Sequence, residues 1–501
     1  MPAIGAPCRE IKTITINGAP NLPASVRKRI ITEFTGRCLN VGDIERILAE
    51  ITKSYIDRGY ITTRAYLPPQ DLSKGHLEIL VIEGVVEKII IEDGNANSIS
   101  IGNVFPGVEG DLLNLRDLEQ GLDQINRLAS NDAQLDIQPG EKPGTSRVVV
   151  RNQPRSRFHF YATVDNQGSE STGELQAGLT ASGDNLLGFN EMLSATHRES
   201  IPGDSGHKDA RSNSVYFSLP FGYTTLSLGA SRSDYDSPIR LSSGRELIAS
   251  GKDEINYVRL DRVMYRNQST HFWLTSMLTT KTTKNYLDDQ FLNVSSRSLT
   301  VLDLDGNLST GFLGGVLTLN LGYAQGLDAL GALHDPDHLP DWAARAQFGK
   351  YKAGLNYARP FRLFNKNASF SSQVSAQKAN DTLYGSEQIS IGGLYSVRGY
   401  VHNTLAGDDG YYWRNEIALH QPLAIGSNTI STRIYAGYDT GKVENRATTL
   451  QQSHLSGMVV GLSAYWRDVS LDLFNTWPLT TLPDTMPKES SQIWFRISYS
   501  I

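Results

Sequence analysis

Two different patterns of hydrophobic and polar positions meet near residue 154. Before it, some apolar residues recur at helical spacing and others alternate in short runs, so both helices and strands are predicted. After it, helical spacing disappears, and apolar residues alternate with polar ones in one segment after another, as in strands with two different faces. The sequence therefore predicts an α+β region over residues 1–153, followed by an all-β region over residues 154–501.

The first part of the α+β region predicts the order β-α-α-β-β. Val26, Ile30 and Phe34 recur every four residues, as on one face of a helix. Asn40 can cap the next helix, with Asp43 in its first turn. The expected elements are strands at 10–17, 61–67 and 76–83 and helices at 22–34 and 41–55.

The same order restarts after Gly84, with Asn114 and Asp117 repeating the capping arrangement. Here we expect strands at 85–91, 133–137 and 146–152, a short helix at 98–105 and a helix after Asn114. A supersecondary unit of about 75 residues that occurs twice indicates two related domains. We assign them to residues 8–83 and 84–153, with residues 1–7 as an N-terminal remnant.

The all-β region predicts a membrane β-barrel. Val469, Leu471 and Leu473 alternate with polar residues, the pattern of strands with an apolar outer face and a polar lumen. Such segments number about sixteen, an even number, as in single-chain bacterial barrels. Long polar connections are expected near 200–210, 235–253, 283–297, 326–346 and 381–409. In the last strand, 492–501, Ile493 and its alternate neighbours should face lipid and Trp494, Arg496 and Ser498 the lumen.

Composition and motifs exclude other classes of protein. The net charge of -6, without blocks of like charge, does not suggest nucleic-acid binding. No apolar run reaches the length of about 18 residues that a transmembrane helix needs. The sequence contains no Gly-x-Ser-x-Gly, His-Glu-x-x-His, Walker A or Cys-x-x-Cys motif. We therefore expect neither catalytic residues, nor a metal site, nor a cofactor.

Two late motifs suggest a contact inside the barrel. The first is Val397-Arg398-Gly399-Tyr400, in a Gly-rich stretch, and the second surrounds Asp439, with Gly437 and Gly441 two residues away on either side. Alternation places Asp439 on the lumenal face of its strand, where the two glycines leave room for an incoming loop. Asp439 would pair with Arg398, or else with Arg433 on the same strand.

These features together resemble the two-partner secretion transporters, a branch of the POTRA-barrel superfamily of outer-membrane proteins. Residues 55–70 are similar to the first POTRA domain of the subgroup that exports haemolysins, adhesins and contact-dependent inhibition toxins. The two late motifs match the family's loop and strand motifs. The resemblance implies two periplasmic POTRA domains, a barrel over 154–501 and an inward-folded loop over 386–409. The loop-barrel lock it implies comprises Val397, Arg398, Gly399, Tyr400, Gly437, Asp439 and Gly441.

The resemblance also implies a function and partners. The chain is expected to be an outer-membrane pore that recognises a large partner protein through its POTRA domains and secretes it to the cell surface. Further expected partners are outer-membrane lipid and, during biogenesis, the barrel assembly machinery, and the chain is expected to be a monomer. The alternative is an assembly and insertion factor for other barrels, although members of that branch usually have more POTRA domains.

Three further features bear on this resemblance. In an oxidising periplasm Cys8 and Cys38 are expected to form a disulfide, and two buried free thiols are the alternative. Family members often begin with a helix that plugs the pore, whereas here the first predicted strand lies close to Met1. Outer-membrane barrels commonly end in an aromatic residue, whereas this chain ends in Ile501.

Overall fold

The computed structural model describes residues 8–94, 97–201, 208–426 and 428–501. They form two compact units. The first is the chain up to Arg157 with the short turns 185–190 and 220–223, and the second is the rest of residues 158–501. The expected remnant at 1–7 lies outside the described residues.

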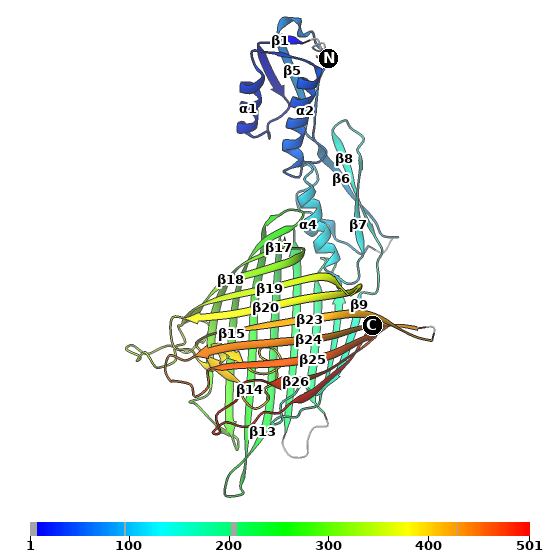
Figure 1. Ribbon diagram of the computed structural model, residues 1–501. Coiled ribbons are helices and arrows are strands. Elements are labelled where there is room, and N and C mark those ends of the chain that lie inside the picture. The colour runs from blue at the N-terminus through cyan, green and yellow to red at the C-terminus, as the bar shows by residue number, and fades with distance from the viewer. Residues whose placement is uncertain (1–7, 95–96, 202–207, 427) are drawn as a thin grey trace. The chain divides into compact units, whose positions relative to one another are not determined.

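The first domain packs two helices on a small mixed sheet (Figure 1). In the sheet β2-β5-β4, β5 pairs parallel with β2 and antiparallel with β4. Ile30, Ile47 and Leu77 are fully buried between helices and sheet, as the predicted helical and strand faces require. The elements are β1 Arg9–Ile11, β2 Thr13–Asn17, α1 Ala24–Phe34, β3 Arg37–Leu39, α2 Val41–Ile56, β4 Arg64–Tyr66, η1 Leu72–Lys74 and β5 His76–Ile82.

Two elements of this domain differ from expectation. The strand expected at 61–67 is only the three residues of β4. The preceding backbone forms turns instead, with the N–H groups of Tyr60 and Thr63 donating to the carbonyls of Tyr55 and Tyr60. The short β3 was not expected, because its three residues carry no alternation; it exists through its pairing with β1.

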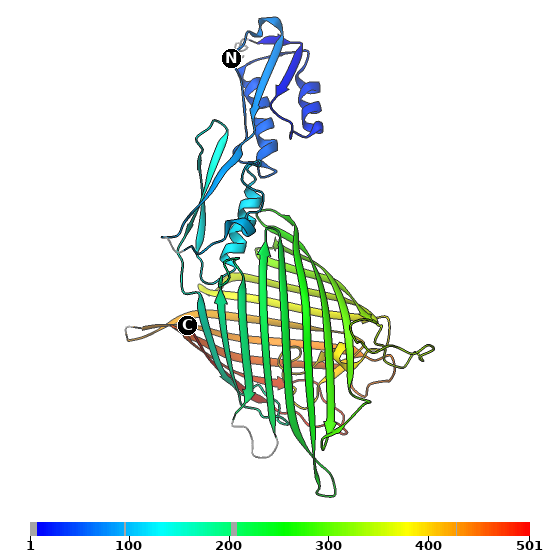
Figure 2. The same ribbon diagram turned by 180° about the vertical axis from the view of Figure 1, so that it is seen from behind.

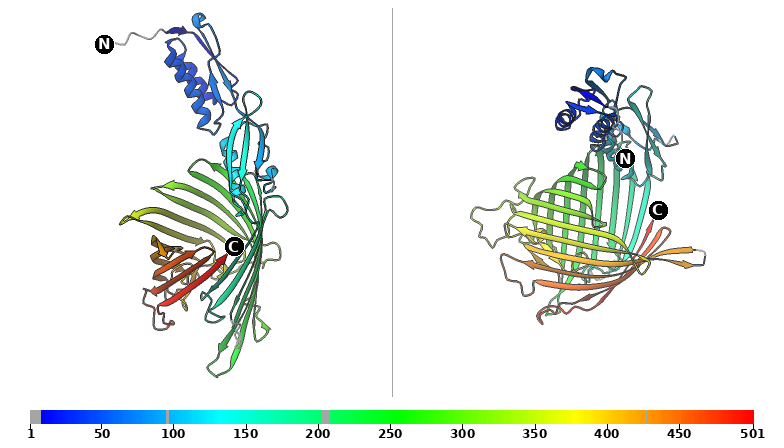
Figure 3. Two further views of the ribbon diagram at one scale, coloured as in Figure 1. Left: turned by 90° about the vertical axis from the view of Figure 1, so that its right-hand side faces the viewer. Right: turned by 45° about the horizontal axis from the view of Figure 1, so that its top comes forward.

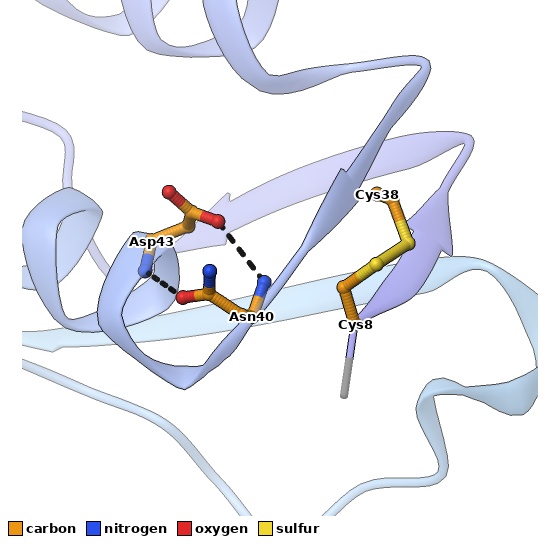
Figure 4. Close-up of a disulfide and its surroundings, with 4 residues drawn as sticks. All are labelled: Cys8, Cys38, Asn40 and Asp43. Atoms are coloured by element: carbon orange, nitrogen blue, oxygen red, sulfur yellow. Dashed lines mark hydrogen bonds between the residues drawn. A yellow bond between two sulfur atoms is a disulfide. The ribbon is translucent and has the colours of Figure 1, made fainter. Parts of the chain in front are cut away.

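Two local constraints hold the start of α2 and the start of the domain. Asn40 accepts a hydrogen bond from the Asp43 N–H (3.0 Å), and Asp43 accepts one from the Asn40 N–H (3.0 Å), forming a capping box (Figure 4). Such a cap is worth about 1 kcal/mol. Close by, the Sγ atoms of Cys8 and Cys38 are bonded, linking the neighbourhoods of β1 and β3 (Figure 4).

We predict that oxidation joins Cys8 and Cys38 in protein matured in the periplasm. Closing a loop of this moderate length should stabilise the domain by about 3 kcal/mol. Mass spectrometry of folded protein without reductant should find neither thiol alkylated. Alkylation of both thiols in protein that was never reduced would disprove the pairing, and Cys8→Ser with Cys38→Ser gives the reduced reference for thermal unfolding.

The second domain repeats the architecture of the first. The strand order β6-β8-β7 again has a central strand that pairs parallel with the first strand and antiparallel with the other. Asn114 caps α4 by accepting a hydrogen bond from the Arg116 N–H (2.9 Å). Leu118 and Ile125 of α4 are fully buried in the core. The elements are β6 Val85–Glu92, α3 Ile101–Val104, α4 Leu115–Asn126, β7 Ala133–Pro139 and β8 Thr145–Asn152.

The second unit is a closed antiparallel barrel, seen from opposite sides in Figures 1 and 2. Leaving aside the two-residue β16 (Gln290–Phe291), the described chain forms sixteen strands around it, which confirms the predicted fold. They follow one another from cyan β9 to red β27, which pairs with β9 (Figure 3). The strands are β9 Phe158–Asp165, β10 Gln176–Asp184, β11 Met192–Ser200, β12 Asp209–Phe221, β13 Thr224–Arg240, β14 Glu246–Arg266, β15 Thr270–Leu287, β17 Arg297–Phe312, β18 Gly315–Leu327, β19 Gly349–Leu363, β20 Lys366–Ala379, β23 Asp409–Ile425, β24 Asn428–Glu444, β25 His454–Trp466, β26 Val469–Pro478 and β27 Gln492–Ser500.

The expected faces of the last strand are observed. Ile493 and Ile497 are exposed on the outer face, whereas Trp494 and Ser498 are buried on the inner face. Arg496 reaches Asp165 across the closing pair, with 3.2 Å between Nε and Oδ2. An apolar outer face and a hydrogen-bonded, charged inner face are what a membrane barrel with a polar lumen requires.

The prediction of a long polar connection at 235–253 was wrong. β13 continues to Arg240 and β14 begins at Glu246, and their ladder is in register to the end, so the connection is only 241–245. Outside the bilayer both faces of a strand meet water, so both faces can be polar. Such a strand lacks the alternation of apolar and polar residues by which it could be recognised in the sequence. None of the helices in the described ranges is long and apolar enough to cross a membrane.

Candidate functional site

A loop between β20 and β23 folds back against the inner face of the barrel wall. It contains η2 (Gly385–Glu387) and a hairpin of β21 (Ile389–Ile391) and β22 (Leu405–Gly407). Val397 and Tyr400 in the stretch between these strands are buried against Val443 of β24 and Leu455 of β25. Packing of apolar side chains thus holds the loop tip on the wall before any charge is considered.

Arg398 is the main polar contact of the loop tip. Its Nε donates to Asp439 Oδ2 (2.6 Å) and its Nη2 to Asp439 Oδ1 (2.8 Å), so the guanidinium binds the carboxylate at two points. The Arg398 backbone N–H also donates to Asp439 Oδ2 (3.1 Å). Arg398 is 5% exposed and Asp439 0%. Such planar, charge-assisted pairing is geometrically specific, and burial makes the loss of one partner costly.

Neighbouring strands extend this pair into a network. Glu416 of β23 accepts a hydrogen bond from Arg398 Nη1 (3.0 Å) and pairs on its other oxygen with Arg433. Arg433 therefore binds Glu416, and the alternative pairing of Arg433 with Asp439 does not occur in the structure. Arg414, opposite Asp439 in the ladder, lies 3.9 Å from it. The guanidinium groups of Arg398, Arg414 and Arg433 thus lie around two carboxylates.

Missing side chains make room for the loop. A Cβ at Gly437 would lie 2.8 Å from Arg398 Nη2, and one at Gly441 would lie 2.9 Å from the Ile391 side chain. Gly457 of β25, directly opposite Asp439 in register, is tighter still: a Cβ there would lie 1.7 Å from the Arg398 carbonyl oxygen. Gly399 has φ +104°, a conformation that residues with a side chain rarely adopt.

Tyr400 completes the tip. Its hydroxyl donates to the Ser456 carbonyl on β25 (2.7 Å) and accepts from the Thr480 N–H (3.2 Å). The structure therefore brings Val397, Arg398, Gly399, Tyr400, Gly437, Asp439 and Gly441 together at one place on the wall. Cys8 and Cys38 belong to the first unit, whereas the loop tip and the strands that it contacts belong to the second.

Sequence reasoning missed two further anchors of the loop. Glu387, 3% exposed, receives hydrogen bonds from Lys281 (2.6 Å) and Lys350 (3.1 Å) on β15 and β19. Glu489, in the connection between β26 and β27, accepts hydrogen bonds from the backbone N–H groups of loop residues 401–403. Neither glutamate lies in a recognisable motif, so only a resemblance covering their neighbourhoods could have indicated them.

Comparison with known proteins assigns the chain to a family. Residues 144–464 match the family described as haemolysin secretion/activation protein ShlB/FhaC/HecB. The chain belongs to this family. Residues 10–84 match the ShlB-type POTRA domain, and residues 85–139 match a further POTRA domain.

Relatives of this family match almost the whole chain. The outer membrane transporter CdiB of Dickeya dadantii (strain 3937) is 32% identical over 99% of this chain and 88% of its own length. The haemolysin transporter ShlB of Serratia marcescens is 31% identical over 99% of this chain and 86% of its own length. The solved structure of CdiB from Escherichia coli has a TM-score of 0.92 at 33% identity, covering 100% of this chain and 92% of that one.

Family membership confirms the class of protein inferred from the sequence. The chain is an outer-membrane transporter of two-partner secretion, with its POTRA domains in the periplasm. This assignment supports secretion over the alternative of a barrel assembly factor. The short turns at 222–223 and 267–269 therefore belong to the periplasmic end of the barrel, and the loop from 380 to 408 enters from the extracellular end.

Proposed function

We propose that the chain secretes one large protein, a haemolysin, adhesin or contact-dependent inhibition toxin, through its barrel without catalysing a reaction. The POTRA domains capture an unfolded segment of this partner, and the lock formed by Arg398 and Asp439 holds the loop that occupies the lumen. The chain acts as a monomer after the barrel assembly machinery has inserted it. We retain the domain limits 8–83, 84–153 and 154–501 as part of this proposal.

One observation favours capture by the second POTRA domain: its sheet has an open edge at β7. Within the described ranges, β7 pairs only with β8, and past Ala133 its outer side has no backbone partner in the domain. An open edge can add a strand from another chain through main-chain hydrogen bonds. A large variable cargo suits this mode, because main-chain groups are the same in every sequence.

The opposite edge of the same sheet is covered. The Val86 N–H donates to the Asp111 carbonyl (2.9 Å), the Gly110 N–H donates to the Val86 carbonyl (2.8 Å), and the Ile89 N–H donates to Glu109 Oε1 (2.7 Å). These contacts use the groups that an added strand would need. The domain therefore offers β7, and not β6, to a partner.

Site-specific photo-crosslinking in secreting cells tests this proposal. A photoreactive residue at Gln134, exposed on β7, should crosslink to the partner during secretion, whereas one at Lys88, exposed on the covered β6, should not. Both positions are exposed and lie on edge strands of one sheet, so the two photoreactive residues differ mainly in whether the backbone edge beside them is open. Equal crosslinking at both would reject β7 as the capture edge, and secretion without any crosslink to the POTRA domains would reject capture by them.

A further inference from the structure

A hollow of 440 Å³ opens on the outer face of the barrel, across β14, β15 and β17. Leu260, Met264, Leu274 and Leu304 line it, and Gly306 forms its floor. Gly306 lies between Leu274 and Leu321 in the ladder, so the absent side chain leaves a gap in an otherwise leucine-covered surface. The volume falls in the range of about 300–1,000 Å³ in which proteins hold small ligands.

The hollow lies near the periplasmic end of the barrel. Arg262 at its edge pairs in register with Thr224, the first residue of β13 after a periplasmic turn. Tyr265, three residues closer to the next turn, is 54% exposed on the outer face, as is typical of the aromatic belt at a membrane interface. The long side chain of Arg262 can therefore reach the phospholipid headgroups of the inner leaflet.

Arg262 is an exposed cation at the edge of this hollow. It makes no ion pair or hydrogen bond with any residue in the described parts of the chain. The contrast is Arg232, at another outer hollow nearer the extracellular end, which lies 3.3 Å from Asp234 and 3.8 Å from Glu254. Of these two arginines, Arg262 is the one available for a phosphate group, which a guanidinium can bind at two points.

We propose that this hollow binds one glycerophospholipid of the inner leaflet, with its phosphate on Arg262 and an acyl chain over Gly306. The charge of Arg262 complements the headgroup, and the leucine-lined hollow continues the lipid-facing surface. Both parts of the lipid are recognised together. Arg262 gives a preference for the phosphate group, and the gap above Gly306 holds the acyl chain in a defined position.

Native mass spectrometry of the full chain in detergent, titrated with phosphatidylglycerol, tests this site. Arg262→Gln should weaken binding of the first lipid about tenfold, because a hydrogen-bonded charge is lost. Gly306→Leu should weaken it similarly by filling the hollow. This variant should fold, since a Cβ at Gly306 would meet no atom closer than 3.7 Å. The matched control Arg232→Gln should leave binding unchanged.

Two comparison probes distinguish the parts of the lipid. Diacylglycerol should bind the wild-type chain about as weakly as phosphatidylglycerol binds Arg262→Gln, and inorganic phosphate alone should not compete. Equal affinity for diacylglycerol and phosphatidylglycerol, or equal loss in Arg262→Gln and Arg232→Gln, would overturn the headgroup site. Full binding by Gly306→Leu, in a barrel that still migrates as folded on a gel, would overturn the acyl-chain site.

Discussion

Arg398→Ala is expected to reduce secretion of the partner protein by at least about tenfold while the barrel still reaches the outer membrane. The change leaves Asp439 buried without its bidentate partner, and stranding a buried charge costs about 3–5 kcal/mol. The loop tip should then be held at Asp439 only by the backbone N–H of residue 398, because both guanidinium bonds to the carboxylate are lost. Secreted partner, normalised to folded barrel in the membrane fraction, is the measurement.

Three further variants test whether the two residues act as one unit. Asp439→Ala should match Arg398→Ala, and the double variant should be little worse than either, since a shared interaction is lost once. Arg398→Lys should rescue poorly, because an ammonium group cannot reproduce the planar fork. Arg433→Gln is the control: it changes an arginine of β24 that bonds Glu416 and not Asp439. Fully additive losses in the double variant would disprove direct coupling.

Gly457→Ala is expected to abolish the contact between Arg398 and Asp439 by adding a single methyl group. Its Cβ would lie 1.7 Å from the Arg398 carbonyl oxygen. Gly457 is paired with Asp439 in the ladder, and the Arg398 backbone N–H is hydrogen-bonded to Asp439, so neither backbone can move freely. The loop must therefore move away, with loss of the Arg398–Asp439 pair. Secretion should fall about as far as in Arg398→Ala, and the change should add little when the two are combined.

Gly354→Ala provides the matched control for this prediction. Gly354 also lies within a barrel strand, β19, but a Cβ there would meet its nearest atom at 3.5 Å, an ordinary contact. Secretion and barrel folding should be unchanged. Normal secretion by Gly457→Ala would show either that the loop tip shifts without cost or that its position on the wall does not matter for transport.

Much of the fold was predictable because its signals are local. Alternation within single strands is enough to indicate a barrel and to assign the faces of β27. The capping box of Asn40 and Asp43 involves residues three apart, so the sequence contains all of it. Strand limits outside the bilayer were less predictable: β13 and β14 continue through residues whose two faces both meet water.

The features of the site likewise divide into those that the sequence indicates and those that only the tertiary structure shows. The sequence alone determined that Asp439 lies on the lumenal face with glycines beside it, because period-two alternation decides the face of a strand residue. Only the tertiary structure decided which arginine meets Asp439, because Arg398 reaches it through the docking of a distant loop, whereas Arg433 lies on the same strand but binds Glu416. Glu416, Gly457, Glu387 and Glu489 became recognisable for the same reason. Each acts through neighbours on other strands or loops, and cross-strand register and loop docking are long-range properties that no short stretch of sequence contains.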